Sequence, residues 1–210
     1  MVLTKFAPQA VKQSSLYKQL MRKRQQWKLR SELSTATPLR VILGAGPTKC
    51  DGWFQTDKEI LDVTSPDDWS RLFAPGSIDT LLSEHMLEHL SEEEAQSALV
   101  ECHRYLKPRG LFRLAVPDGY RRDPAYLKEV APPADGHKML YTIDTLTALL
   151  QSAGFETKPL EYFDAEERFH AFAWDQKDGM IMRSVRFDTQ QEFQRNGFFY
   201  TSLIVDARKQ

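Results

Sequence analysis

The stretch RVILGAG, residues 40–46, decides the fold, because a short apolar run stops there at two glycines. Two later segments have the same form. IDTLL (78–82) ends at Ser83-Glu84-His85, and LFRLAV (111–116) ends at Pro117-Asp118. Short apolar runs that alternate with helical sequence indicate a mostly parallel α/β sheet, in which ligands lie outside the carboxyl ends of the strands. We therefore expect these glycines, carboxylates and the histidine to border one cleft.

Two helices are expected beside these strands. Residues 91–94, Ser-Glu-Glu-Glu, form a capping box, and the helix that they begin ends near Pro108 and Gly110. A second helix begins near Thr142 and ends at Gly154. Both patterns place helices between strands, as a parallel sheet requires.

The C-terminal part of the chain predicts two further strands, at 157–162 and 201–207. Between them we expect a hairpin insertion near 163–197, with a turn at 177–179 that joins 169–174 to 180–187. Because hairpin-like rather than helical sequence joins the two strands, the last strand is predicted to be antiparallel.

The N-terminal 38 residues are expected to form a basic helical arm in front of a domain at 39–210. Residues 1–40 contain nine Lys or Arg and one acid, Glu32, whereas the rest contains 19 basic and 28 acidic residues. A helix is predicted from about residue 10 to 32, with Leu16, Leu20 and Trp27 on one side. Basic residues 5–30 either pack against the acidic domain or bind nucleic acid or an anionic surface.

The composition is typical of a water-soluble globular protein, with 41% hydrophobic and 27% charged residues among 210. No apolar run is long enough for a membrane span, and Met1–Gln13 lack the apolar stretch of a secretory signal. Two cysteines, Cys50 and Cys102, are too few for a disulfide framework. We expect a cytoplasmic protein.

The ordered set of motifs resembles class I S-adenosylmethionine-dependent methyltransferases, and more narrowly the small bacterial type-11 group. The pieces that carry the resemblance are LGAG (43–46), GWFQTD (52–57), SEHMLEHL (83–90), LKPRG (106–110), VPD (116–118) and His137-Lys138 ahead of the helix that begins near Thr142. The resemblance implies a Rossmann-like, mostly parallel seven-stranded sheet flanked by helices, with the last strand antiparallel, and S-adenosyl-L-methionine as cofactor.

The resemblance also implies where the cofactor binds. Gly44, Ala45 and Gly46 would hold its methionine end, since glycines let the backbone turn sharply and approach a ligand. Asp57 can accept hydrogen bonds from both ribose hydroxyls, as in dinucleotide-binding folds, and Asp62 resembles the family acid that meets the adenine amino group. Glu84 and His85 are expected beside them.

The chain departs from the family pattern at the first crossover. Only about seven residues separate Gly46 from the second strand, whereas a parallel crossover usually needs a dozen or more. The first crossover is therefore predicted to be shortened, and we expect the basic N-terminal helix to cover that face of the sheet instead. Ile42 also stands where the family often has an acid.

Candidate general bases are His85, Asp118 and His137, acting on an unidentified acceptor, which we expect to be a small molecule. We assign no metal ligands, although His85, Glu88 and His89 would share a face if their segment were helical. The alternative is a catalytically inactive domain that binds the cofactor or a partner. A nucleotide-dependent oxidoreductase is disfavoured, because Lys49 replaces the third glycine of Gly-x-Gly-x-x-Gly.

Overall fold

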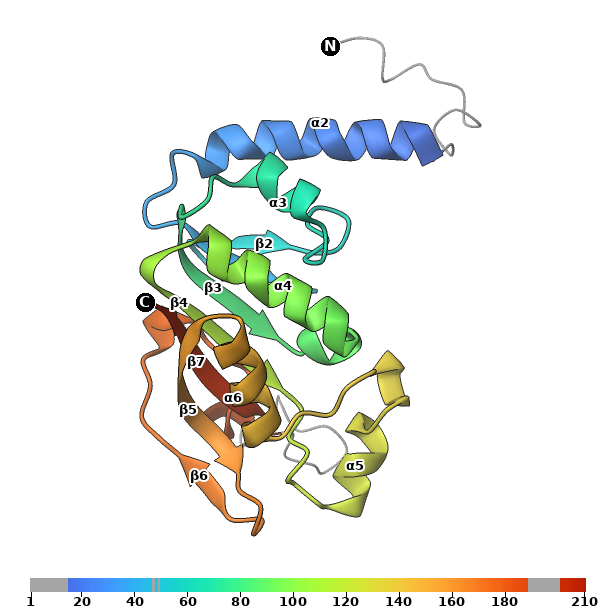
Figure 1. Cartoon of the computed structure of the whole chain (residues 1–210), viewed down its shortest axis with the longest axis vertical. Helices are drawn as coiled ribbons and strands as arrows, with labels where there is room; N and C mark the ends of the chain where they lie inside the picture. Colours follow the sequence, from blue (N-terminus) through green and yellow to red (C-terminus); the bar gives the residue numbers. More distant parts are fainter. Residues whose placement is uncertain (1–14, 47, 49, 189–200) are drawn as a thin grey trace.

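A seven-stranded sheet forms the centre of the protein (Figure 1), in a computed structural model that describes residues 15–46, 48, 50–188 and 201–210. Its strand order is β2-β1-β3-β4-β7-β5-β6. The strands are β1 (Arg40–Leu43), β2 (Phe54–Thr56), β3 (Ile78–Glu84), β4 (Leu106–Val116), β5 (Phe155–Phe163), β6 (Phe169–Ala171) and β7 (Leu203–Lys209).

The strand directions confirm the predicted fold class. β2, β1, β3 and β4 are parallel, whereas β7, the last strand of the chain, runs antiparallel to both β4 and β5. The seventh strand is β6, which pairs with β5. No strand is assigned between β2 and β3 in the described part of the chain.

Helices cover one face of the sheet (Figure 1). They are α3 (Pro66–Leu72), α4 (Glu92–Tyr105) and α6 (Ile143–Ser152). Their apolar side chains bury Val41, Leu43 and Leu81 in the larger core, in which Trp69 stacks on Tyr105 at 5.2 Å between ring centroids. The predicted capping box at Ser91 and Glu94 is present, and Thr142 caps α6 as expected.

The N-terminal helix does not cover the opposite face, so that expectation is wrong. α2 (Ser15–Leu33) lies against α3 instead, where Arg22 and Gln26 reach the carboxylate of Asp68. As predicted, no helix separates β1 from β2 among the described residues. The opposite face is covered by residues 173–187, which we call the strap: Ile181 packs there on Ile42 and Leu82.

The predicted hairpin with a turn at 177–179 is also wrong. The first expected strand forms only as β6, Phe169–Ala171, which pairs with β5. The second expected strand does not form, because Gln176–Asp178 (η3) is a 3-10 turn and Val185–Asp188 (α7) is helical. The physical reason is Arg113 of β4, whose Nη1 donates to the carbonyl oxygens of Asp175 and Gly179, both at 2.7 Å. This guanidinium holds the strap in a bend over the sheet.

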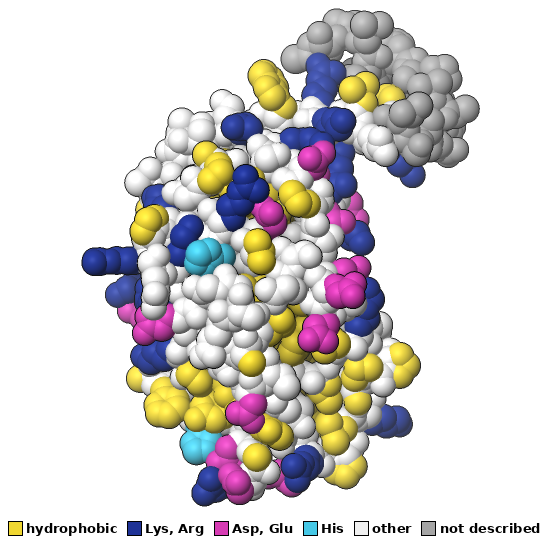
Figure 2. Space-filling view, viewed as in Figure 1, with side chains coloured by type: hydrophobic (Ala, Val, Ile, Leu, Met, Phe, Trp, Pro, Cys, Tyr) yellow, Lys and Arg dark blue, Asp and Glu magenta, His cyan; other side chains and the backbone are white. Residues whose placement is uncertain are grey.

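α2 is attached by polar contacts and by Leu29 and Leu33, which pack in the larger core, rather than by the predicted apolar stripe, of which the Leu16 side chain lies outside the described part. Leu20 is 63% exposed and Trp27 is 77% exposed, whereas Gln26 is fully buried. Figure 2 shows Lys and Arg side chains on the surface of α2, at the top of the view. Arg22 and Arg30 bind the domain, because Arg22 pairs with Asp68 and Arg30 Nη1 donates to the Ser70 carbonyl at 2.9 Å. None of the described helices is long and apolar enough to cross a membrane.

Asp68 is the centre of this attachment. Its carboxylate accepts hydrogen bonds from Gln26, Arg22, Arg71 and the backbone N–H of Asp62. The side chain of Asp68 is 3% exposed, so these donors depend on a buried acceptor.

Replacing Asp68 by Ala is expected to lower the free energy of unfolding by about 3 kcal/mol or more, because buried donors lose their acceptor. Urea unfolding measures the change. Asp67→Ala is the matched control, since the Asp67 carboxylate is 79% exposed and pairs with Arg71 at the surface. This substitution is expected to lower the free energy of unfolding by about 1 kcal/mol at most. Equal losses in the two variants would contradict this assignment.

Candidate functional site

A cavity of about 350 Å³ opens at the carboxyl ends of β1, β2 and β3. This is the edge at which ligands bind in open α/β sheets. Its wall combines residues that follow the three strands with residues from later segments. They are Gly44, Asp57, Lys58, Leu61, Asp62, Val63, Thr64, His85, Met86, His89, Leu90, Glu94 and Lys138.

Gly44 forms the tight turn at the end of β1. Its φ is +61°, and a Cβ at this position would lie 2.6 Å from Cγ of Met86. Only glycine fits here, since a side chain would be strained and would collide with Met86. Ala45 and Gly46 are not among the lining residues: Ala45 is buried in the core under the strap, and Gly46 is exposed.

Two predicted acids lie in the cavity wall. Asp57 Oδ1 accepts a hydrogen bond from the backbone N–H of Gly46 at 3.0 Å, which fixes the carboxylate beside the glycine turn. Asp62 Oδ1 accepts from the N–H and the hydroxyl of Thr64, at 3.1 and 2.7 Å. Both carboxylates are therefore held in place before any ligand binds.

His85 is the predicted base that reaches the cavity. Its backbone has φ of +55°, and its N–H donates to the carbonyl of Ala115 at 2.9 Å. Ring Nε2 lies 2.7 Å from Ser202 Oγ, and Nδ1 lies 3.0 Å from Glu88 Oε1. Burial lowers the pKa of His85 below its usual value, which favours the neutral imidazole that can accept a proton.

Comparison with known proteins agrees with this geometry. Residues 58–114 match the family model described as a methyltransferase domain. A SAM-dependent methyltransferase from Archaeoglobus fulgidus has a TM-score of 0.51 and 15% identity, and the match covers 90% of this chain and 94% of that one. This is a class I methyltransferase fold.

One further solved structure is similar to this methyltransferase fold. An S-adenosylmethionine-dependent methyltransferase from Mesorhizobium loti has a TM-score of 0.49 and 16% identity, over 87% of this chain and 96% of that one. No curated protein matches the sequence. The family match confirms the resemblance that the ordered motifs indicate.

Within the methyltransferase fold, Glu84 lies away from the cavity lining. Its carboxylate accepts hydrogen bonds from the backbone N–H groups of Met182 and Arg183 in the strap, at 3.1 and 2.8 Å. Glu84 and His85 are adjacent, yet one is bound to the strap and the other lines the cavity. The cofactor-binding role of Glu84 stays a prediction.

Asp118 and His137 are buried and do not line the cavity. Asp118 accepts from the backbone N–H groups of Phe163 and Tyr120, at 2.7 and 2.9 Å, so its carboxylate joins β4 to β5. Ring Nδ1 of His137 lies 2.7 Å from the carbonyl of Val130. Their catalytic roles also stay predictions.

Glu94 and Lys138 form an ion pair in the cavity wall that the sequence does not predict. Glu94 is identified there only as a helix-capping residue, yet its Oε2 also accepts from Lys138 Nζ at 2.7 Å. This contact with Lys138, helped by the Ser91 backbone, lowers the pKa of Glu94 to about 2. Glu94 and Lys138 are 44 residues apart, and nothing in the sequence around either residue indicates that they meet.

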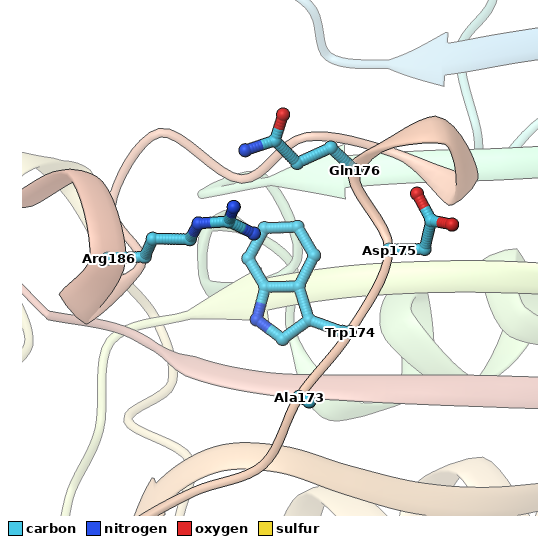
Figure 3. A pocket seen from close by; sticks show the side chains of 5 residues that line it. All are labelled: Ala173, Trp174, Asp175, Gln176 and Arg186. Carbon is cyan, nitrogen blue, oxygen red and sulfur yellow. The ribbon is translucent and has the colours of Figure 1, made fainter.

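A second cavity, of about 390 Å³, lies on the strap (Figure 3). Ala173, Trp174, Asp175, Gln176 and Arg186 line it. In Figure 3 the Arg186 side chain points toward the indole ring of Trp174. None of the predicted catalytic or cofactor-binding residues belongs to this cavity.

The buried carboxyl group of Asp118 predicts a measurable pH dependence. Burial raises the pKa of Asp118 to about 6, above the value of an unfolded chain. Between about pH 4 and 6 the folded state therefore holds a proton that the unfolded state has released. The contribution of Asp118 to the free energy of unfolding is expected to fall by up to about 3 kcal/mol as pH rises through that range.

Urea unfolding of the wild type and Asp118→Asn at pH 4 and pH 6.5 tests this expectation. The wild type should lose more stability between the two pH values than the variant, which has no carboxyl group at this position. Identical pH profiles would show that Asp118 titrates normally.

Proposed function

We propose that this protein transfers a methyl group from S-adenosyl-L-methionine to an unidentified acceptor. The observation that carries the proposal is the cavity at the strand carboxyl ends, because it brings Gly44, Asp57, Asp62 and His85 together from three separate segments. The match of residues 58–114 to a methyltransferase domain supports the same reaction.

The cavity offers a suitable partner for each part of the cofactor. Asp57 is placed to accept from ribose hydroxyls, and Asp62 from an adenine amino group. Leu61 and Met86 provide apolar walls for a purine. The carboxylates also favour a positively charged sulfonium over a neutral ligand.

Methyl transfer needs alignment more than acid–base chemistry. The sulfonium already activates the methyl group, so holding donor and acceptor in line is worth up to about 7–11 kcal/mol. Where the acceptor carries a proton, neutral His85 is the residue we assign to remove it. Its orientation is fixed by Ser202 on one nitrogen and Glu88 near the other.

We favour a small-molecule acceptor in a water-soluble, cytoplasmic protein. Lys18, Lys23, Arg24 and Lys28 of α2 remain exposed and are available for an anionic partner. They lie on a different element from the residues that line the cavity, so such a partner would add to the methyl acceptor rather than replace it.

One observation favours the second candidate, a methyltransferase-like domain that binds without catalysis. Met86 packs directly on Gly44, where the methionine end of the cofactor would lie, and Asp57 is already bonded to Gly46. Turnover across a panel of oxygen, nitrogen and carbon acceptors separates the candidates: tight cofactor binding with no turnover on the panel supports the inactive domain.

Calorimetry with S-adenosylhomocysteine tests the proposed cofactor site. The wild type is expected to bind one equivalent. Asp57→Asn and Asp62→Asn should each weaken binding by about 10- to 100-fold, because each removes a charged acceptor.

Asp51→Asn is the matched control, since Asp51 is exposed near the glycine turn and does not line the cavity. It should bind as the wild type does. Circular dichroism checks that Asp57→Asn, which also weakens the bond to Gly46, remains folded. Absence of binding by the folded wild type would overturn the proposed function.

A further inference from the structure

A buried carboxylate without a hydrogen bond lies behind the cavity. Glu88 in η1 (Leu87–His89) is fully buried, and neither carboxylate oxygen has a hydrogen-bond partner among the described residues. The nearest polar atom is His85 Nδ1, which lies 3.0 Å from Oε1. Burying an anionic carboxylate costs several kcal/mol unless a cation or several donors compensate. A cation bound beside Glu88 would compensate this cost.

Two further ligand atoms converge on this carboxylate. Glu88, His89 and His137 each offer one atom, and the three atoms lie within 4.8 Å of one another. The imidazole rings of His89 and His137 meet edge to face, with centroids 4.9 Å apart. This group contains His137 in place of His85, which the sequence places with Glu88 and His89 if residues 85–89 form a helix. Residues 87–89 instead form a short 3-10 turn that begins after His85.

The hydrogen bonding of His137 leaves one ring nitrogen facing Glu88. Nδ1 lies 2.7 Å from the carbonyl oxygen of Val130, which can only accept, so Nδ1 carries the proton. In the neutral ring Nε2 then holds a lone pair, and it lies 4.0 Å from Glu88 Oε1. Nε2 is therefore the ring nitrogen of His137 that is placed to bind a metal ion together with the Glu88 carboxylate.

We propose that Glu88, His89 and His137 bind a divalent transition-metal ion. Two imidazoles and one carboxylate suit ions such as Zn²⁺, Co²⁺ or Fe²⁺ rather than Mg²⁺ or Ca²⁺, which prefer oxygen ligands. A metal-binding histidine typically donates its second ring N–H to a backbone carbonyl, as His137 does to Val130. In a tetrahedral site with metal–ligand bonds of about 2.0–2.2 Å, ligand atoms lie about 3.5 Å apart, so the three ligand atoms would move closer together on binding.

The ion would lie in the wall of the cavity and join two segments of the chain. His89 lines the cavity, whereas His137 follows η2 (Ala134–Gly136) and lies behind it. The backbone already connects them, because the N–H groups of Lys138 and Met139 donate to the carbonyl of Glu88 at 2.8 and 3.1 Å. The inference does not rest on the proposed function, because metal binding is measured without cofactor or acceptor.

Metal binding by the untagged full-length protein tests the proposal. After dialysis against a chelator, the protein is titrated with Zn²⁺ by calorimetry and with Co²⁺ by visible absorption. We expect one equivalent of either ion, a Co²⁺ spectrum typical of nitrogen and oxygen ligands, and a melting temperature that rises with metal and falls again with EDTA.

His89→Gln and His137→Gln should each weaken binding at least about tenfold. His170→Gln is the matched control: His170 pairs with the carboxylate of Asp164 at 2.8 Å on β6, apart from the cluster, and should bind metal as the wild type does. Glu88→Gln is measured as well, with circular dichroism to establish that it folds.

Two results would overturn the metal site. One is binding of less than one equivalent by the wild type, or equal binding by all variants. The other is a ¹⁵N NMR spectrum that shows protons on both nitrogens of His137 after Zn²⁺ addition, because a proton rather than the metal ion would then lie beside Glu88.

Discussion

A parallel sheet that is buried on both faces needs two covers, and the second cover of this protein depends on Arg113. Its guanidinium is 1% exposed and forms paired hydrogen bonds with Asp206 of β7, at 2.7 and 2.9 Å. The same group binds the carbonyls of Asp175 and Gly179 and lies 4.8 Å from the Trp174 ring. A buried charge without these partners would be strongly destabilising, so the strap and the charge stabilise each other.

Adjacent residues at the carboxyl edge are divided between the cavity and the strap. Gly44 and His85 line the cavity, whereas their neighbours Ala45 and Glu84 belong to the strap side. The sequence motifs predict correctly which edge of the sheet carries the polar residues. They mark a continuous run of residues, however, and the positive φ of Gly44 and His85 turns the backbone there, so adjacent residues of the run face different sides.

The parts that sequence did not predict depend on contacts between distant residues. The alternating strand and helix patterns are local, so the sheet, α4, α6 and their caps follow from them. The course of the strap is set by Arg113, more than sixty residues earlier in the chain. The attachment of α2 is set by one buried carboxylate, Asp68, which looks like any other acid of a helical first turn.

The strap is fastened to the cavity edge at adjacent positions. Met182 and Arg183 bind the Glu84 carboxylate, and the carbonyl of Arg183 accepts from the N–H of Ser202, whose hydroxyl contacts the His85 ring. This chain of bonds gives the two sides of the sheet a mechanical linkage. The strap and the imidazole at the cavity edge are therefore positioned by one continuous set of hydrogen bonds.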